Sequence, residues 1–348
     1  MKEKKTLQAK ASPYAPPYMI TTEIVHLVAE ICETVGRFGA AADVMINPRL
    51  RRENRIRSIQ GSLAIEQNSL SLDQVTAVIQ GRRVLGSPRE IQEVRNAFAA
   101  YEALPHWSPT EMDDLLAAHR LLMAGLVDEP GVFRRGGIGV FKDQQVVHVA
   151  PPAGRVPKLM ADLLNWLKTN PEHPLIAGCI FHYEFEFIHP FADGNGRMGR
   201  LWQTLILSRW QPWLAFIPVE PVIRERQDEY YQALRQSDRQ AEATRFIVFM
   251  LVALRDTLEQ LAADQVSDHV TDQVKSFLRI LSMGDMTLSE AMKKLSLAHR
   301  PSFRSTYIHP AMRMGLVEMT QPDAPRSPTQ WYRLTLKGRS ILEEIGKS

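Results

Sequence analysis

The sequence predicts a mainly α-helical fold with one small β-hairpin, followed by a separate C-terminal domain. Apolar residues recur every three or four positions through most of residues 22–261, which indicates amphipathic helices. A glycine-rich stretch before residue 138 interrupts this pattern, and the last eighty or so residues show a different order of elements. We therefore expect three parts: an N-terminal helical region (1–105), a core with the hairpin (106–261) and a C-terminal domain (266–348).

The helices expected before the C-terminal domain follow the apolar periodicity, and Pro88 lies near the start of one of them. Residues 262–268 are polar and are expected to form a linker. The expected helices cover residues 22–35, 51–68, 89–103, 109–125, 156–167, 174–188, 197–207, 227–236 and 245–261.

The hairpin is expected from two short runs of strand-forming residues, 138–141 and 145–149. Residues 142–144 form a compact turn between them. Pro151 and Pro152 end the second strand, because proline cannot donate a ladder hydrogen bond.

The C-terminal domain has the element order of a winged helix-turn-helix. Helices are expected at 272–281, from about 286 and at 302–314, and strands at 316–320 and 331–336. This region is basic, with twelve Lys and Arg against eight Asp and Glu from residue 266 onward. Such a domain binds DNA through its third helix, and the candidates are Arg300, Arg304, Thr306, Tyr307 and, in the wing, Arg326. Protein docking or dimerisation is the alternative, suggested by Ile308, Met312 and Met314 in the third helix.

Composition excludes several classes of protein. The chain has 348 residues and a formal net charge of +3, which by itself indicates neither nucleic acid nor membrane as a partner. No apolar run is long enough for a transmembrane helix, and the first twenty residues lack the apolar core of a signal peptide. Cys32 and Cys179 are the only cysteines, so a disulfide framework and a thiolate zinc site are excluded. We expect a cytoplasmic protein with no membrane association.

Residues 189–200 carry the chemistry. Pro190 disfavours helical geometry at His189, so a helix should end there. Gly194 and Gly196 flank Asn195, and an apolar helical pattern begins directly afterwards. A turn of this kind at a helix N-terminus points backbone N–H groups outward, which suits phosphate oxygens.

The side chains around this turn agree with a phosphate site. Arg197 and Arg200 stand three residues apart, on one face of the expected helix, and can bind more than one phosphate. Asp193 is a hard oxygen ligand of the kind that holds phosphate-bound Mg²⁺. His189 supplies a base that titrates near neutral pH. Together they predict phosphoryl or nucleotidyl transfer.

A metal site is the competing interpretation. His182, Glu186 and His189 lie at i, i+4 and i+7, a spacing that suits zinc or iron. It leaves the Gly-Asn-Gly turn and both arginines without a role. The phosphate interpretation is therefore favoured, and His182 is expected to be a core residue.

The motif His-Pro-Phe-Ala-Asp-Gly-Asn-Gly-Arg-Met-Gly-Arg resembles the signature of the Fic family, His-x-Phe-x-Asp/Glu-Gly-Asn-Gly-Arg-x-x-Arg, at every defined position. The hairpin with residues 131–134 before it resembles the target-binding flap of that family, and residues 159–166 and 182–183 also read like Fic proteins. The resemblance covers about residues 20–260. It implies a Fic-type helical bundle.

The resemblance also implies an activity: transfer of AMP from ATP to a Ser, Thr or Tyr hydroxyl of a protein, with Mg²⁺ bound and pyrophosphate released. His189 would deprotonate the hydroxyl, and Asp193 would hold Mg²⁺. Phe191 is expected to anchor the loop on the core. The residues implied to contact ATP are Gly194, Asn195, Gly196, Arg197, Met198, Gly199 and Arg200. Tyr230 and Tyr231 are candidates to flank the adenine, and at least one of them is expected to pack in the core instead. Those implied to line the target-binding flap are Ile138, Val140, Val147 and Val149.

An upstream segment resembles the inhibitory motif of the same family, Ser/Thr-x-x-x-Glu-Gly/Asn. Ser62 and Glu66 match it, whereas Gln67 departs from it and is expected to loosen or reposition the inhibitory helix. A carboxylate that pairs with Arg200 would occupy the partner of the γ-phosphate and repel the triphosphate. We therefore expect autoinhibition through Glu66 and Arg200.

Several alternatives stay open. The chain is either an enzyme of this kind or a DNA-binding regulator whose core only senses nucleotide, and the presence of His189 favours the enzyme. Fic relatives also use UTP or CDP-choline or phosphorylate their targets, whereas the full motif with Gly196 and both arginines favours ATP and AMP transfer. Removal of AMP from a modified protein is a further alternative, in which Glu66 would position a water for the reverse reaction. The protein target is not named by the sequence, and self-modification and a homodimer are further expectations.

Overall fold

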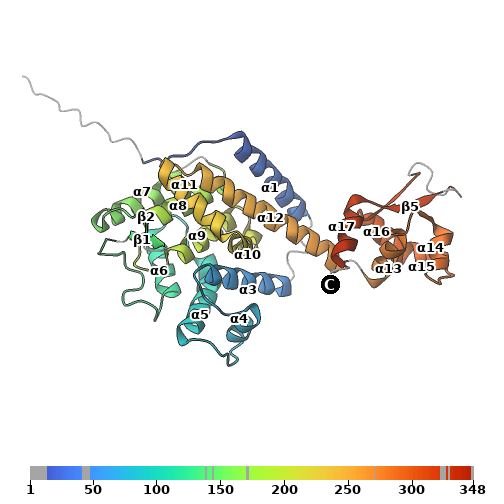
Figure 1. The fold of residues 1–348 in the computed structure, drawn as a ribbon, viewed down its shortest axis with the longest axis horizontal. Coiled ribbons are helices and arrows are strands. Elements are labelled where there is room, and N and C mark those ends of the chain that lie inside the picture. Colours follow the sequence, from blue (N-terminus) through green and yellow to red (C-terminus); the bar gives the residue numbers. More distant parts are fainter. Residues whose placement is uncertain are drawn as a thin grey trace, which may run out of the picture. The chain divides into compact units, whose positions relative to one another are not determined.

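The fold comes from a computed structural model that describes residues 14–40, 48–137, 139–142, 145–169, 172–269, 271–321, 327 and 330–345. The chain forms two compact units, Met1–Leu258 and Glu259–Ser348. Helices dominate both units, which confirms the predicted mainly α-helical class (Figure 1). Among the described residues, no helix is both long enough and apolar enough to cross a bilayer.

The helices of the first unit match the apolar periodicity, with ends that shift by a few residues. The short helices α4 and α10 are not predicted by the sequence, because fewer than three turns carry too little periodicity to detect. The helices are α1 (Thr22–Ala40), α3 (Pro48–Ile65), α4 (Leu72–Ile79), α5 (Pro88–Ala103), α6 (Met112–Leu122), α7 (Val156–Thr169), α8 (Pro174–Ile188), α9 (Asn195–Trp210), α10 (Glu220–Glu225), α11 (Gln227–Gln240) and α12 (Thr244–His269). The first unit contains α12 as far as Leu258.

Helices α8 and α9 form the centre of this unit, with α3, α4 and α5 to one side (Figure 1). Twelve of the fifteen residues of α8 are buried, as expected for a helix that is apolar on all sides. The two helices approach closely at Gly199, where a Cβ atom would lie 2.7 Å from the ring of His182. The loop between α8 and α9 is therefore held at both ends by packed helices.

The hairpin is present as strands β1 (Gly139–Lys142) and β2 (Gln145–Val149). They pair antiparallel, with Gly139 opposite Val149 and a bulge between Val140 and Phe141. Ile138, expected in the first strand, lies outside the described residues. Val140, Val147 and Val149 lie on the paired strands as expected.

The expected linker at 262–268 is wrong in its secondary structure. Helix α12 runs without interruption from Thr244 to His269. Its sequence contains no glycine or proline, so nothing in the backbone ends the helix where the polar residues begin.

The second unit has the predicted order of three helical segments followed by two strands, with two additions. Strand β3 pairs with β5, so the sheet has three antiparallel strands in the order β3–β5–β4. A final helix begins at Leu336, a residue expected in a strand. The elements are α13 (Asp272–Leu281), β3 (Met286–Thr287), α14 (Leu288–Lys294), α15 (Arg300–Phe303), a π-helical turn (Arg304–Ile308), α16 (His309–Arg313), β4 (Val317–Met319), β5 (Trp331–Leu334) and α17 (Leu336–Ile345).

The apolar residues that suggested protein docking belong instead to the core of this unit. Ile308 is buried, and Met312 and Met314 pack against the same cluster of buried side chains. The third helical segment therefore turns its apolar residues inward.

Candidate active site

The loop between α8 and α9 begins and ends with left-handed backbone. Helix α8 stops at His189, which has φ 50°, and the residue before α9, Gly194, has φ 83°. Between them the side-chain amide of Asn195 closes the loop: its Oδ1 accepts from the N–H of Phe191, and its Nδ2 donates to the carbonyl of Phe191, both at 2.9 Å. The loop thus has one fixed shape.

Phe191 is fully buried and anchors this loop. The ring of His119, on α6, stacks on it at 3.6 Å between centroids. Nδ1 of His119 accepts from the N–H of Gly131 at 2.8 Å, so Nε2 carries the proton and donates to the carbonyl of Asp193 at 3.0 Å. Burial, the largest effect, lowers the pKa of His119 to about 4, which keeps the ring neutral. His119 therefore connects the loop to the segment that leads into the hairpin.

Arg134 makes a second connection between the loop and the hairpin. Its guanidinium donates to the carbonyls of His189 at 2.7 Å, Ile188 at 3.3 Å and Pro151. Its backbone N–H also donates to the carbonyl of Pro190 at 2.9 Å. The backbone at His189 is therefore fixed from the hairpin side, and its side chain remains about one fifth exposed.

The first turn of α9 faces an anion site. The amides of Asn195, Gly196 and Arg197 have no intrahelical acceptor, because they open the helix, and the helix dipole favours negative charge there. Arg197 and Arg200, one turn apart on α9, are both buried. This is the arrangement of amides and guanidinium groups that the sequence predicts.

A carboxylate already occupies part of this anion site. Oε1 of Glu66, at the end of α3, accepts from Nη2 of Arg200 at 2.7 Å. Arg200 also donates through Nε to the hydroxyl of Ser62 and through Nη2 to its carbonyl, both at 3.0 Å. A Cβ atom on Gly196 would lie only 2.4 Å from Oε1 of Glu66, so the carboxylate rests directly on the first turn of α9. Burial alone would lower the pKa of Arg200, but the Glu66 carboxylate raises it above its ordinary value.

Helix α3 presents Glu66 from a fixed position. At Gly61, α3 packs so closely on α10 that a Cβ atom would lie 2.8 Å from the backbone N of Pro221. Arg55 donates to the carbonyl of Tyr101 on α5, and Gln227 donates to the carbonyl of Ile65 at 2.8 Å. Contacts with α10, α5 and α11 therefore fix the position of the helix that carries the carboxylate.

Gln67 lies where helix α3 ends, in the left-handed region with φ 69°. The N–H of Asn68 reaches back to the carbonyl of Leu63 at 3.0 Å, as in helices that end on a left-handed residue. Glycine and asparagine adopt this conformation at least cost, which explains the pattern Gly/Asn at this position of the motif. The expected loosening of the helix by Gln67 is not seen in the geometry, since Glu66 reaches Arg200 with Gln67 in place.

Replacing Gln67 by glycine is therefore expected to stabilise the first unit. Relief of the left-handed strain should raise the free energy of unfolding by about 0.5–1 kcal/mol, seen as a small rise in melting temperature. The same change at Gln60, inside α3, should destabilise by about 1 kcal/mol and serves as the control. A Gln67→Gly variant that melts earlier than the wild type would contradict this account.

Asp193 lies at the exposed edge of the loop within a group of four charged residues. Its Oδ1 is 3.1 Å from Nη2 of Arg197, and its Oδ2 is 3.1 Å from Nη2 of Arg89 on α5. Glu93, one turn after Arg89, lies 3.4 Å from Arg197 and 3.5 Å from Arg89. The sequence does not predict that Arg89 and Glu93 belong to the site, because charged residues on a helix far away in the sequence form no recognisable motif with the loop.

The residues present fit magnesium that arrives with a nucleotide. Asp193 offers one partly exposed carboxylate beside the anion site, and Mg²⁺ is often held by one or two carboxylates plus substrate phosphates. The competing zinc or iron site is wrong for the described residues, which contain no group of three or more His, Cys, Asp or Glu able to hold a metal ion. His182 is instead a core residue: Nδ1 donates to Gln203, Nε2 accepts from Tyr230, and burial lowers its pKa to about 3.

Some of the residues named for ATP contact lie in packed surroundings. Met198 is fully buried, and its N–H donates to the carbonyl of Gly194. Gly199 allows α8 and α9 to approach, and Tyr230 is buried against His182. The contact of Met198 and Gly199 with ATP stays a prediction, because motif spacing identifies the residues but not the side of the helix that each occupies. Tyr230 is the core residue that we expected at least one of the two tyrosines to be. Tyr231 is half-buried at the edge of the site, where burial and the nearby Glu66 carboxylate raise its pKa.

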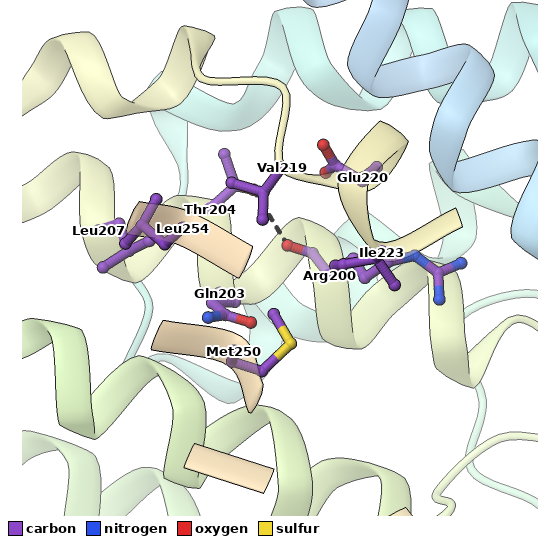
Figure 2. Close-up of a pocket in the computed structure, with 9 residues that line it drawn as sticks. All are labelled: Arg200, Gln203, Thr204, Leu207, Val219, Glu220, Ile223, Met250 and Leu254. Carbon is purple, nitrogen blue, oxygen red and sulfur yellow. Dashed lines mark hydrogen bonds between the residues drawn. The ribbon is translucent and has the colours of Figure 1, made fainter. Parts of the chain in front are cut away.

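A small hollow of about 20 Å³ lies behind Arg200, between α9, α10 and α12. Figure 2 shows its lining residues, most of them apolar, with the Arg200 guanidinium at the edge of the group. It has room for about one water molecule and is far too small for a nucleotide. This hollow is therefore not the nucleotide site that the sequence predicts.

Together the fold and the loop define a helical protein with an anion site at a central helix N-terminus and a β-hairpin connected to it. Residues 109–207 match the Fic/DOC family, and residues 272–335 match the C-terminal domain of Fic-like proteins (filamentation induced by cAMP). The crystal structure of a Fic family protein from Desulfovibrio desulfuricans G20 is 62% identical and superposes with a TM-score of 0.71, covering 93% of this chain and 99% of that one. The chain belongs to the Fic family.

Curated relatives are more distant. Protein adenylyltransferase Fic of Aedes aegypti is 28% identical over 224 residues, which cover 61% of this chain and 42% of the relative. Protein adenylyltransferase Fic of Nematostella vectensis is 28% identical over 238 residues, which cover 65% of this chain and 53% of the relative. The chain thus spans about half the length of the curated relatives it matches.

Proposed function

We propose that this protein transfers AMP from ATP to a hydroxyl of a protein side chain and releases pyrophosphate. The observation that carries the proposal is the placement of His189 at one end of a rigid loop whose other end is the anion site of α9. A base beside a site for two or more phosphates is what attack on the α-phosphate requires. The names of the curated relatives, protein adenylyltransferase, agree with this activity.

Each residue of the loop has a defined task in this reaction. His189 removes the proton of the attacking hydroxyl. The amides of Gly194, Asn195 and Gly196 bind the α- and β-phosphates, while Arg197 and Arg200 bind the β- and γ-phosphates. Asp193 holds Mg²⁺, which when bound neutralises phosphate charge.

The target is proposed to enter along the hairpin. Strands β1 and β2 form a two-stranded sheet, and a backbone segment of the target can add to such an edge. Ile138, Val140, Val147 and Val149 belong to this flap. Strand addition uses main-chain hydrogen bonds, so it selects an extended segment more than a sequence, and a segment of the same protein also qualifies.

We further propose that the protein is autoinhibited. The Glu66 carboxylate lies on Arg200 and on the first turn of α9, where the γ-phosphate would otherwise bind. A nucleotide can still bind to the remaining amides, but its triphosphate is displaced from the geometry for transfer. Removal of the carboxylate should therefore activate the enzyme.

The test is label transfer in the presence of Mg²⁺, to the protein itself and to a cell lysate. Label from α-³²P-ATP, but not from γ-³²P-ATP, supports AMP transfer, and intact mass confirms the addition of one AMP. Label from the γ-phosphate indicates phosphorylation instead, and label from UTP or CDP-choline indicates another donor. Release of AMP from modified target by the wild type, but not by Glu66→Gly, indicates removal of AMP. Nucleotide binding without transfer from any donor supports a regulator that only senses nucleotide.

DNA binding by the second unit is a second candidate function, favoured by its surface charge. Between Leu288 and His309 the side chains of Lys293, Lys294, Arg300 and Arg304 are exposed, and Glu290 is the only acidic residue. The carboxylate of Glu290 accepts hydrogen bonds from the backbone N–H and the hydroxyl of Thr287, the N-cap residue of α14. Four exposed cations on consecutive helical segments suit a phosphate backbone.

Duplex DNA binding, measured by fluorescence anisotropy at several salt concentrations, tests this candidate. The double variant Arg300→Ala and Arg304→Ala should weaken binding about tenfold and lower the salt slope by about two. The control removes Lys337 and Arg339, two exposed cations of α17. Equal losses of DNA affinity in both double variants, or no DNA binding by the wild type, would contradict the proposed DNA-binding function. A protein would then be the remaining candidate for the partner of this unit.

A further inference from the structure

Two guanidinium groups share the carboxylate of Asp193, and they differ in how freely they can leave it. Arg197 is only 6% exposed and also lies 3.4 Å from Glu93, so its position is fixed. Arg89 is 57% exposed and reaches Oδ2 of Asp193 from the first turn of α5. Oδ1 of Asp193 also accepts from the N–H of Gly194 at 2.6 Å. Oδ2 is therefore the oxygen whose charged partner stands at the surface.

Arg89 has a second acceptor close by. Its Nε lies 3.5 Å from Oε1 of Glu93, and Nη1 lies 3.4 Å from the carbonyl of Leu126. A guanidinium that leaves Asp193 therefore keeps a carboxylate partner one turn along the same helix. Because Glu93 is only 12% exposed, it remains in place to receive it.

We propose that Arg89 competes with the divalent cation for Asp193 and so sets the cation concentration at which metal–nucleotide binds. This inference rests on the proposed role of Asp193 as the metal ligand. With Arg89 on Oδ2, a dication must break an ion pair and approach a like charge. When the cation binds, the Arg89 guanidinium moves to Glu93, and Asp193 exchanges one cationic partner for another.

The competition has a predicted sign. Removal of the Arg89 charge should tighten cation binding, whereas a residue that binds phosphate or only orders Asp193 would weaken binding when removed. From the usual strength of an exposed ion pair and of one neighbouring like charge, the gain should be about three- to tenfold in affinity. Arg89→Lys keeps the positive charge but changes the geometry of the donor. Its cation affinity should therefore lie between those of the wild type and Arg89→Ala.

The experiment measures Mn²⁺ binding by electron paramagnetic resonance, with the full chain and α,β-methylene-ATP, which cannot release AMP. Every variant carries Glu66→Gly, because Glu66 otherwise occupies the anion site. Arg89→Ala should bind Mn²⁺ about three- to tenfold more tightly, and Arg89→Lys by less. Arg95→Ala removes an exposed arginine from the same helix and should leave the affinity unchanged.

The variant Asp193→Ala tests the metal role of Asp193 separately from the competition by Arg89. If it fails to reduce nucleotide-dependent Mn²⁺ binding, the proposed metal role of Asp193 is wrong, and the inference about Arg89 is overturned with it. If Asp193→Ala reduces binding but Arg89→Ala leaves it unchanged or weaker, only the competition is refuted. If Arg95→Ala and Arg89→Ala raised the Mn²⁺ affinity equally, net charge alone would explain the effect, and the competition between Arg89 and the cation would also be refuted.

Discussion

His189→Ala is expected to reduce AMP transfer by about 10²–10⁴-fold, the usual contribution of a general base. The hydroxyl of a serine, threonine or tyrosine is almost fully protonated at neutral pH, so the attack needs a group that takes its proton. The loss should appear in kcat, because the anion site is built from backbone amides and arginines that the change does not touch. Nucleotide affinity, measured by calorimetry, should stay within about twofold of the wild type.

The comparison is best made in the Glu66→Gly background, where transfer is fastest. His106→Ala removes an exposed histidine from the turn after α5 and should retain full activity. A His189→Ala variant that keeps more than a tenth of the rate would mean that another group accepts the proton. A loss of nucleotide binding together with activity would instead assign His189 to loop structure, where its left-handed backbone already places it.

The sequence predicts the central loop well because its constraints are local. Pro190 ends one helix, Gly194 supplies a left-handed residue, and the apolar pattern after Asn195 begins the next helix. All three are properties of adjacent residues, and the structure shows each of them. The contact of Glu66 with Arg200 spans 134 positions, and only the resemblance to a known motif predicts it.

The parts of the site that the sequence does not predict come from elsewhere in the chain. His119 reads as one member of an apolar stripe, and a buried histidine in a helix is usually only packed. Its role in fixing the loop depends on Gly131 and Asp193 lying on its two ring nitrogens, which periodicity cannot indicate. Arg89 and Glu93 read as ordinary surface charges, since nothing in their spacing refers to the loop.

Neither motif membership nor polarity tells which way a residue faces or where a helix ends. Met198 and Gly199 lie inside the motif, yet the structure packs them against the core, because successive residues of a helix point in different directions. Residues 262–268 are polar yet helical, because polarity alone does not end a helix that lacks glycine and proline. Motif membership therefore does not predict which face of a helix a residue occupies, and polarity does not predict where a helix ends.

Glu66→Gly is expected to raise the rate of AMP transfer about 10- to 100-fold. In the wild type the carboxylate makes a charge-assisted hydrogen bond of 2.7 Å to Arg200. A bond of this kind contributes about 1.5–3 kcal/mol, and the γ-phosphate must replace it to reach Arg200. Each 1.4 kcal/mol that the nucleotide no longer has to overcome corresponds to about a tenfold gain. The negative charge over Gly196 is removed by the same change.

Two further variants distinguish charge from flexibility as the cause of this gain. Glu66→Gln keeps the shape and can still accept from Arg200 but carries no charge, so its rate should lie between the wild type and Glu66→Gly. Glu53→Gln neutralises an exposed glutamate of the same helix and should leave the rate unchanged. Equal initial rates of α-³²P incorporation for the wild type and Glu66→Gly would show that the carboxylate does not hinder the triphosphate. Activation by Glu66→Gly alone, with Glu66→Gln at the wild-type rate, would assign inhibition to the occupied volume above Gly196 and not to the charge.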